Sequence, residues 1–203
     1  MPESVRPRIG AVLAALLATL TLFVVAGCSS VAADEPTRTG NSEGYVGVEK
    51  SVTLIPPDKR QSAPPISGER LGGDGKTIDI AALGGKVVVL NVWGSWCGPC
   101  RAEAPALQQA SEQTAGVAQF VGLNTKDHDQ GPAEAFNRAF GITYPSIWDP
   151  TGSILVSLSD TLPPKGIPST LIIDREGRVA ARIVGTVTET TLVDLITDVA
   201  AGR

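Results

Sequence analysis

The stretch VVVLNVWGSWCGPC, which runs from Val87 to Cys100, decides the fold of this chain. Its first six residues are apolar except for Asn91, and they predict a strand that is buried on both faces. Pro99 is typical of the first turn of a helix, because that turn leaves its N–H groups unpaired and proline has none to lose. A strand that leads a Cys-x-x-Cys pair into a helix indicates thiol–disulfide exchange.

The two cysteines of this pair are expected to have different tasks. Cys97 should lie just before the first helical turn and Cys100 one turn into the helix. The free N–H groups and the helix dipole stabilise a thiolate at such a position and lower its pKa. We therefore expect Cys97, as the more exposed of the two, to be the nucleophile and Cys100 to resolve the mixed disulfide. Trp93 and Trp96 flank the pair and are expected to shield one side of it.

Other chemistries of a cysteine pair fit this chain less well. A structural zinc site takes four ligands, whereas the chain offers this pair and one histidine, His128, in a polar run that predicts a solvated loop. Haem attachment requires histidine directly after the second cysteine, and that position is Arg101. A purely structural disulfide remains open, although so short a loop contributes little stability. We expect no metal, and no cofactor besides the redox-active Cys97–Cys100 disulfide.

The N-terminal segment predicts export. Arg6 and Arg8 precede an uncharged, mostly apolar run over residues 11–27, which is followed by Cys28. This pattern is typical of a secretory signal over residues 1–27, and Val-Ala-Gly before Cys28 resembles a bacterial lipobox, in which the new N-terminal cysteine carries a diacylglycerol. The alternative is an uncleaved membrane anchor, since the run approaches the minimum length for spanning a bilayer. Both interpretations place the remainder outside the cytoplasm and tethered to the membrane.

Composition and charge indicate one acidic domain on a linker. The chain of 203 residues has 17 Lys and Arg against 21 Asp and Glu, a net charge of −4, which argues against nucleic acid as a partner. Residues 28–59 are rich in Ser, Thr, Glu, Gly and Pro and predict a flexible tether, within which residues 52–55 are compatible with a short strand. Residues 60–203 are then long enough for one domain.

The pattern after residue 86 alternates between strands and helices. It predicts strands at 87–92, 117–123, 144–148, 170–173 and 179–184. It predicts helices at 99–114, with Gly116 as the C-cap, at 132–140, ended by Gly141, and after the N-cap Thr188. Crossover helices between early strands, followed by a hairpin, predict an α/β fold with a mixed central sheet and helices on both faces. This is the thioredoxin-like arrangement, with an insert at about 133–160.

The residues from Val87 to Pro105, VVVLNVWGSWCGPCRAEAP, resemble the TlpA/ResA-like branch of the thioredoxin superfamily. Members are membrane-tethered thiol–disulfide oxidoreductases, and several serve cytochrome c maturation. The resemblance extends over roughly residues 66–200. Pro105 matches the proline at which the family kinks its active-site helix.

A second stretch, residues 167–170 (Ile-Pro-Ser-Thr), resembles the cis-proline loop of the family. The resemblance implies a cis bond before Pro168 and a backbone beside Cys97 that pairs with an extended substrate; the alternative is an ordinary proline at the start of a strand. The substrate-binding residues are then expected to be Trp96, Gly98, Pro99, Ile167 and Pro168.

Glu103 matches an acidic residue of the ResA-like group. The resemblance implies that it lies near the buried cysteine and helps to move protons during exchange. A solvated glutamate in the first turn of the helix is an equally open alternative. Asn91 stands where cytoplasmic thioredoxins place a buried aspartate, and this departure makes Glu103 the better candidate for the proton acceptor.

The direction of electron flow is suggested by Gly-Pro between the cysteines, which is the dipeptide of thioredoxin. Thioredoxin has a potential of about −270 mV, against about −120 mV for the oxidant DsbA, so the dipeptide favours a reductase. The resemblance implies a membrane electron donor of the CcdA or DsbD type and disulfides of exported proteins as substrates, such as oxidised Cys-x-x-Cys-His segments of apocytochrome c. Two alternatives are a disulfide oxidase or isomerase for exported proteins, and a non-catalytic module that binds apocytochrome or haem.

Overall fold

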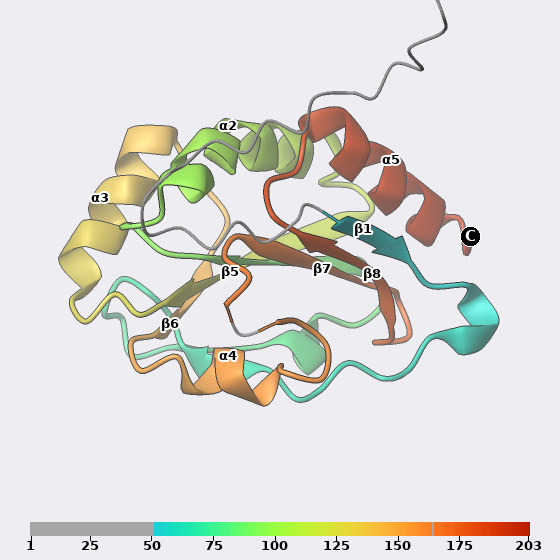
Figure 1. Cartoon of the computed structure of the whole chain (residues 1–203), viewed down its shortest axis with the longest axis horizontal. Helices are drawn as coiled ribbons and strands as arrows, with labels where there is room; N and C mark the ends of the chain where they lie inside the picture. Colours follow the sequence, from blue (N-terminus) through green and yellow to red (C-terminus); the bar gives the residue numbers. More distant parts are fainter. Residues whose placement is uncertain (1–50, 164) are drawn as a thin grey trace, which may run out of the picture. The chain divides into compact units, whose positions relative to one another are not determined.

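A mixed six-stranded sheet forms the centre of the domain in the computed structural model, which describes residues 51–163 and 165–203 (Figure 1). In spatial order the strands are β1 (Ser51–Leu54), β8 (Val179–Val184), β7 (Ser169–Ile173), β4 (Val87–Trp93), β5 (Ala118–Thr125) and β6 (Ser146–Asp149). The strands β4, β5 and β6 are parallel, whereas β7, β8 and β1 add on in antiparallel fashion. The active-site strand β4 is therefore central and has a neighbour on each side.

Helices cover both faces of this sheet, as the sequence predicts. One face carries α2 (Gly98–Gln113), α3 (Gln130–Phe140) and α5 (Glu189–Ala200), which lie together above the sheet in Figure 1. The opposite face carries α4 (Ser153–Ser157), a small sheet of β2 (Ser67–Glu69) and β3 (Thr77–Asp79), and the 3-10 turn η2 (Ile80–Leu83). A further 3-10 turn, η1 (Pro57–Lys59), follows β1.

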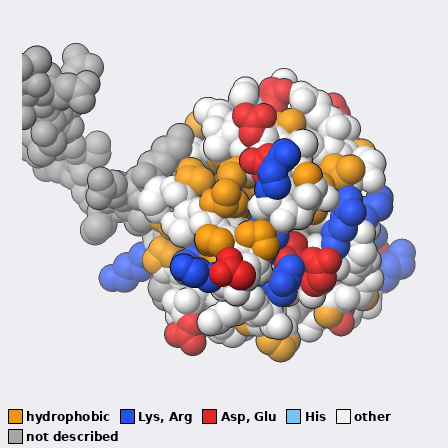
Figure 2. Space-filling model, turned by 90° about the vertical axis from the view of Figure 1, so that its right-hand side faces the viewer, with side chains coloured by type: hydrophobic (Ala, Val, Ile, Leu, Met, Phe, Trp, Pro, Cys, Tyr) orange, Lys and Arg blue, Asp and Glu red, His pale blue; other side chains and the backbone are white. Residues whose placement is uncertain are grey.

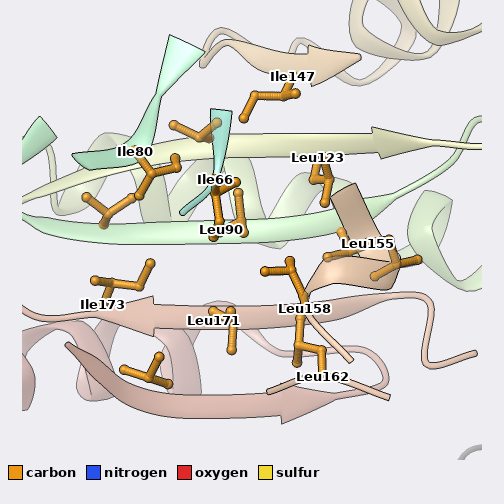
Figure 3. Packing of buried hydrophobic residues seen from close by; sticks show 14 residues of the cluster. Ile66, Ile80, Leu90, Leu123, Ile147, Leu155, Leu158, Leu162, Leu171 and Ile173 are labelled. Carbon is orange, nitrogen blue, oxygen red and sulfur yellow. The ribbon is translucent and has the colours of Figure 1, made fainter. Parts of the chain in front are cut away.

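Successive side chains of β4 point to opposite faces of the sheet and so contribute to two separate layers of the core. Val87 and Val89 pack beneath α2 and α5, whereas Val88 and Leu90 point to the opposite face, where they meet Ile66 and the side chains shown in Figure 3. All seven residues of β4 are buried. Since burying one such aliphatic side chain contributes about 1.5–3 kcal/mol, this strand anchors the segment that leads to the cysteines.

Most predicted elements are confirmed, with local differences. Gly141 ends α3 in the left-handed region at φ 64°, and Thr188 caps α5 by accepting a hydrogen bond from the Thr191 N–H. The predicted C-cap Gly116 is wrong, because α2 already ends at Gln113 with Thr114 as its cap. The short elements β2, β3 and α4 do not follow from the sequence pattern.

The predicted start of the domain at residue 60 needs correction. Residues 51–54 form β1, which pairs with β8 along its whole length, so at least residues 51–59 belong to the domain and not to the tether. The residues of β1 are exposed, so the ladder hydrogen bonds with β8 hold the short strand that the sequence allows at residues 52–55. The predicted signal (1–27), Cys28 and the tether as far as residue 50 lie outside the described residues.

The face of the domain seen in Figure 2 carries mixed charge. Figure 2 shows acidic and basic side chains interspersed around a group of hydrophobic side chains on the face that it presents. This differs from the basic stripe that is typical of a nucleic-acid-binding face. Among residues 51–163 and 165–203, no helix has the length and hydrophobicity needed to cross a membrane.

Candidate active site

The cysteine pair lies where the sequence predicts it, at the N-terminus of α2. Cys97 is the N-cap, and its sulfur accepts a hydrogen bond from the Cys100 N–H at 3.2 Å. The two sulfurs form a disulfide whose Cα atoms are 5.3 Å apart. Gly98 and Pro99 fill the first helical turn, so the missing N–H of Pro99 costs no helical hydrogen bond. After reduction, the same N-terminus stabilises a thiolate on Cys97.

The expected difference in exposure between the cysteines is wrong for this disulfide form. Both residues are 1% exposed, because they pack in one cluster with Trp93, Ala104 and Phe136. The assignment of Cys97 as the nucleophile therefore depends on its N-cap position. Trp96, by contrast, is 50% exposed, so only one of the two flanking tryptophans lies at the surface.

The loop before Cys97 is held by Asp127, which the sequence pattern placed in a solvated run. Asp127 is buried, and its carboxylate accepts hydrogen bonds from the Ser95 N–H at 2.8 Å, the Ser95 hydroxyl at 2.6 Å and the Asn124 amide at 2.6 Å. Lys126 precedes it with φ 60°, a left-handed conformation that non-glycine residues rarely adopt. His128, the next residue, is exposed as predicted.

The same turn also holds two indole rings. The carbonyl oxygen of Thr125 accepts a hydrogen bond from the Trp96 indole at 3.3 Å, and that of Asp127 accepts one from the Trp148 indole at 2.9 Å. Residues 124–127 therefore fix the loop before the cysteines and the exposed ring beside them. A strand end followed by Lys-Asp-His gives no sequence signal for this role, because it depends on contact with a loop 32 positions earlier.

Arg101 connects the start of α2 with α3. Its guanidinium lies over the rings of Phe136 and Phe140, at 5.7 and 5.2 Å from their centroids, and donates a hydrogen bond to the Ser95 carbonyl at 3.4 Å. Phe136 in turn packs on Trp93, with ring centroids 4.5 Å apart. The helix α3 thus forms one wall of the active site.

Glu103 is buried, which excludes the solvated glutamate that the sequence left open. Its carboxylate accepts hydrogen bonds from the Asn91 amide at 3.0 Å and from the Val187 N–H at 3.1 Å. Asn91 also donates to the Thr170 hydroxyl at 3.2 Å, so this network connects β4, β7 and α2. Glu103 follows Cys100 by one helical turn and lies on a neighbouring part of the same helix face. This placement is compatible with the predicted proton-transfer role.

Tyr144 completes this buried polar region. Burial of its phenol, together with the nearby negative charge of Glu103, raises the pKa of Tyr144 well above its ordinary value of 10.0. No motif in the sequence marks Tyr144, because an aromatic residue in a predicted short strand is typical of a core.

The predicted cis-proline loop is present. The peptide bond between Ile167 and Pro168 is cis, and Ser169, which follows, pairs with Val92 of the active-site strand. Ile167 is half-buried and packs against the cluster that contains both cysteines. The structure therefore brings all five predicted substrate-binding residues to one end of the sheet: Trp96, Gly98, Pro99, Ile167 and Pro168.

Comparisons with known proteins agree with this geometry. The Redoxin family model matches residues 58–197. The chain is 31% identical to the thiol–disulfide oxidoreductase ResA of Bacillus subtilis over 132 residues, which cover 64% of this chain and 70% of ResA. It is 32% identical to the thiol:disulfide interchange protein HelX of Rhodobacter capsulatus over 144 residues, which cover 70% and 77% of the two chains.

A solved structure shows the same fold. A secreted thiol–disulfide isomerase from Corynebacterium glutamicum superposes with a TM-score of 0.70 at 31% identity, covering 74% of this chain and 92% of that chain. The chain therefore belongs to the Redoxin family, and it is a thiol–disulfide oxidoreductase of the ResA and HelX type with a thioredoxin-like fold.

Proposed function

We propose that this member of the Redoxin family is an extracytoplasmic reductase that opens disulfides in exported proteins. The observation that carries the proposal is the placement of Cys97 as N-cap of α2 with Gly98-Pro99 in the first turn, the dipeptide of reducing thioredoxins. In the reduced enzyme the Cys97 thiolate attacks a substrate disulfide, and one substrate sulfur leaves as a thiolate and takes up a proton. Cys100 then loses its proton and attacks the mixed disulfide. The second substrate sulfur leaves as a thiolate and is protonated, so the substrate departs as a dithiol and the Cys97–Cys100 disulfide of the structure forms.

The surroundings of Cys97 support a protein substrate in an extended conformation. Trp96 offers a half-exposed ring. The N–H of Ile167 is bonded to the Lys165 carbonyl at 3.2 Å, so its own carbonyl is the group that we propose to pair with an extended substrate. We propose apocytochrome c as the substrate class, because the TlpA/ResA-like resemblance implies it and its Cys-x-x-Cys-His segment must be a dithiol before haem attaches. A reductase outside the cytoplasm also needs electrons, so we propose a membrane donor of the CcdA or DsbD type.

The location is proposed from the N-terminal sequence. The apolar run that ends at Cys28 supports export and lipid attachment, and the structural neighbour from Corynebacterium glutamicum is secreted. Radiolabelled palmitate should mark the wild-type protein and not the variant Cys28→Ser, because the proposed acyl chains are carried by this cysteine. A wild-type protein that takes up no label would favour the uncleaved anchor.

Substrate trapping tests the proposed function. The variant Cys100→Ala keeps the nucleophile but loses the resolving thiol, so it should hold proteins that arrive as disulfides in a stable adduct with Cys97. Adducts isolated from cells should contain exported proteins with a Cys-x-x-Cys-His segment, and the matched variant Cys97→Ala should collect far fewer of them.

Two results would contradict the proposal. Adducts only with exported proteins that hold several disulfides and lack this segment would favour the isomerase, in line with the name of the Corynebacterium relative. Full function of a Cys97→Ser, Cys100→Ser double variant would favour the binding module.

A further inference from the structure

A small cavity lies between Cys100 and the wall formed by α3. Its volume of about 10 Å³ is close to what one water molecule needs. Most of the lining is apolar, and the polar contributions come from Asn91, Asn137 and Tyr144. The complete lining is Asn91, Trp93, Cys100, Ala104, Leu107, Phe136, Asn137, Ile142 and Tyr144.

The side-chain oxygen of Asn137 is the unexplained group at this cavity. It is buried and has no hydrogen-bond partner among residues 51–163 and 165–203. An unpaired buried carbonyl is costly, so such a group in a native protein requires an explanation. Asn137 lies in the last turn of α3, where asparagine is a weaker helix former than leucine or alanine.

The redox chemistry of Cys100 provides the missing partner. In the disulfide, the Cys100 sulfur carries no proton and cannot donate a hydrogen bond. Reduction adds two electrons and breaks the sulfur–sulfur bond. One proton is taken up from the solvent by Cys100, which becomes a thiol, while Cys97 is the thiolate at the helix N-terminus. The reduced enzyme therefore has a donor at the cavity that the oxidised enzyme lacks.

We propose that Asn137 accepts a hydrogen bond from the Cys100 thiol in the reduced enzyme, directly or through one water molecule in this cavity. The bond forms in the dithiol only, so it stabilises the reduced form and raises the reduction potential. It also keeps the proton on Cys100 while Cys97 attacks the substrate. This inference rests on the disulfide exchange that the family performs and not on the proposed reductase direction.

The redox equilibrium of Asn137→Leu tests the proposal. Leucine has a similar size but no acceptor, so the equilibrium constant for dithiol formation, measured in glutathione buffers by thiol alkylation, should fall about three- to tenfold. A tenfold change corresponds to a potential about 30 mV more negative. The matched control Arg138→Leu places the same side chain one residue further on α3, at an exposed position, and should leave the equilibrium unchanged.

Two further measurements separate this role from a structural one. Denaturation of Asn137→Leu should show a loss of stability in the reduced form alone, because the oxidised form loses only an unpaired carbonyl. Asn137→Asp keeps an acceptor and should hold or raise the potential. An unchanged potential with equal loss of stability in both redox forms would overturn the proposal, as would a potential that Asn137→Leu makes less negative.

These outcomes are independent of the proposed function. Trapping of multiply bridged proteins by Cys100→Ala would refute the reductase while leaving the hydrogen bond intact. An unchanged potential in Asn137→Leu would refute the hydrogen bond while leaving the reductase intact.

Discussion

Replacement of Asp127 should loosen the loop that positions Cys97. The carboxylate of Asp127 is the shared acceptor for the Ser95 N–H, the Ser95 hydroxyl and the Asn124 amide. Two substitutions separate the shape of this group from its charge. Asp127→Ala removes all three hydrogen bonds, whereas Asp127→Asn keeps the shape and one oxygen.

The contacts set the size of both effects. In Asp127→Ala, the partly buried Ser95 N–H and the buried Asn124 amide lose their acceptor, at about 1–3 kcal/mol each, while the Ser95 hydroxyl can turn away. We expect a total loss of about 3 kcal/mol in the free energy of unfolding. In Asp127→Asn, the remaining oxygen can accept from both of these groups, and the new NH₂ can donate to the Ser95 hydroxyl. That variant should lose about 1 kcal/mol, the difference between charged and neutral hydrogen bonds.

Two assays check this prediction. Urea denaturation of the oxidised enzyme gives the free energies, and amide hydrogen exchange reports on the Ser95 N–H itself. That amide should be protected in the wild type and in Asp127→Asn, and should exchange rapidly in Asp127→Ala. Asp129→Ala is the matched control: Asp129 caps α3 through the Gly131 N–H, so its loss should leave the Ser95 amide protected. Equal stability loss in both Asp127 variants, or a Ser95 amide still protected in Asp127→Ala, would refute the reasoning.

Two further predictions concern pH. Because the pKa of Tyr144 is raised, the folded state keeps the phenolic proton at a pH at which the unfolded state releases it. The free energy of unfolding therefore falls as the pH rises above about 10. Denaturation curves between pH 8 and about 11 should show that Tyr144→Phe lacks this part of the alkaline loss. Burial opposes ionisation of Asp174, but hydrogen bonds from Arg178 and Arg60 outweigh it and lower its pKa below 3.8. Asp174→Asn should therefore lower the free energy of unfolding by about 3 kcal/mol at pH 7. The difference between the variant and the wild type should shrink as the pH falls below 4, because the wild-type carboxylate then becomes protonated. An equal difference at pH 3 and pH 7 would contradict this.

The parts of the fold that the sequence predicts are those with strong local signals. The apolar run before Cys97 predicts β4, and Gly141 and Thr188 mark the ends of helices through backbone conformation and capping. The missed elements lack such signals. The strands β2 and β3 have three residues each, too few for a clear alternation, and the glycines between them favour a loop. The strand β1, which the sequence allows at residues 52–55, pairs with a partner that is distant in sequence.

The site residues that the sequence predicts are likewise those that belong to a recognisable motif. The positions of Cys97, Cys100 and Pro168 follow from their motifs, and each lies at the expected place. The roles of Asp127 and Asn137 do not follow, because a polar residue in a loop or helix is ordinarily solvated. Asp127 is buried because its turn folds back on Ser95. The side-chain oxygen of Asn137 is buried because α3 packs against α2 through Phe136.

The redox state of Cys97 and Cys100 in intact cells tests the central claim most directly. Acid quenching followed by thiol alkylation and a mobility shift separates the dithiol from the disulfide. A reductase supplied by a membrane donor should be mostly dithiol, and removal of the donor should convert it to the disulfide. A disulfide pool that persists when the apocytochrome c substrates are removed would contradict the reductase and favour an oxidase.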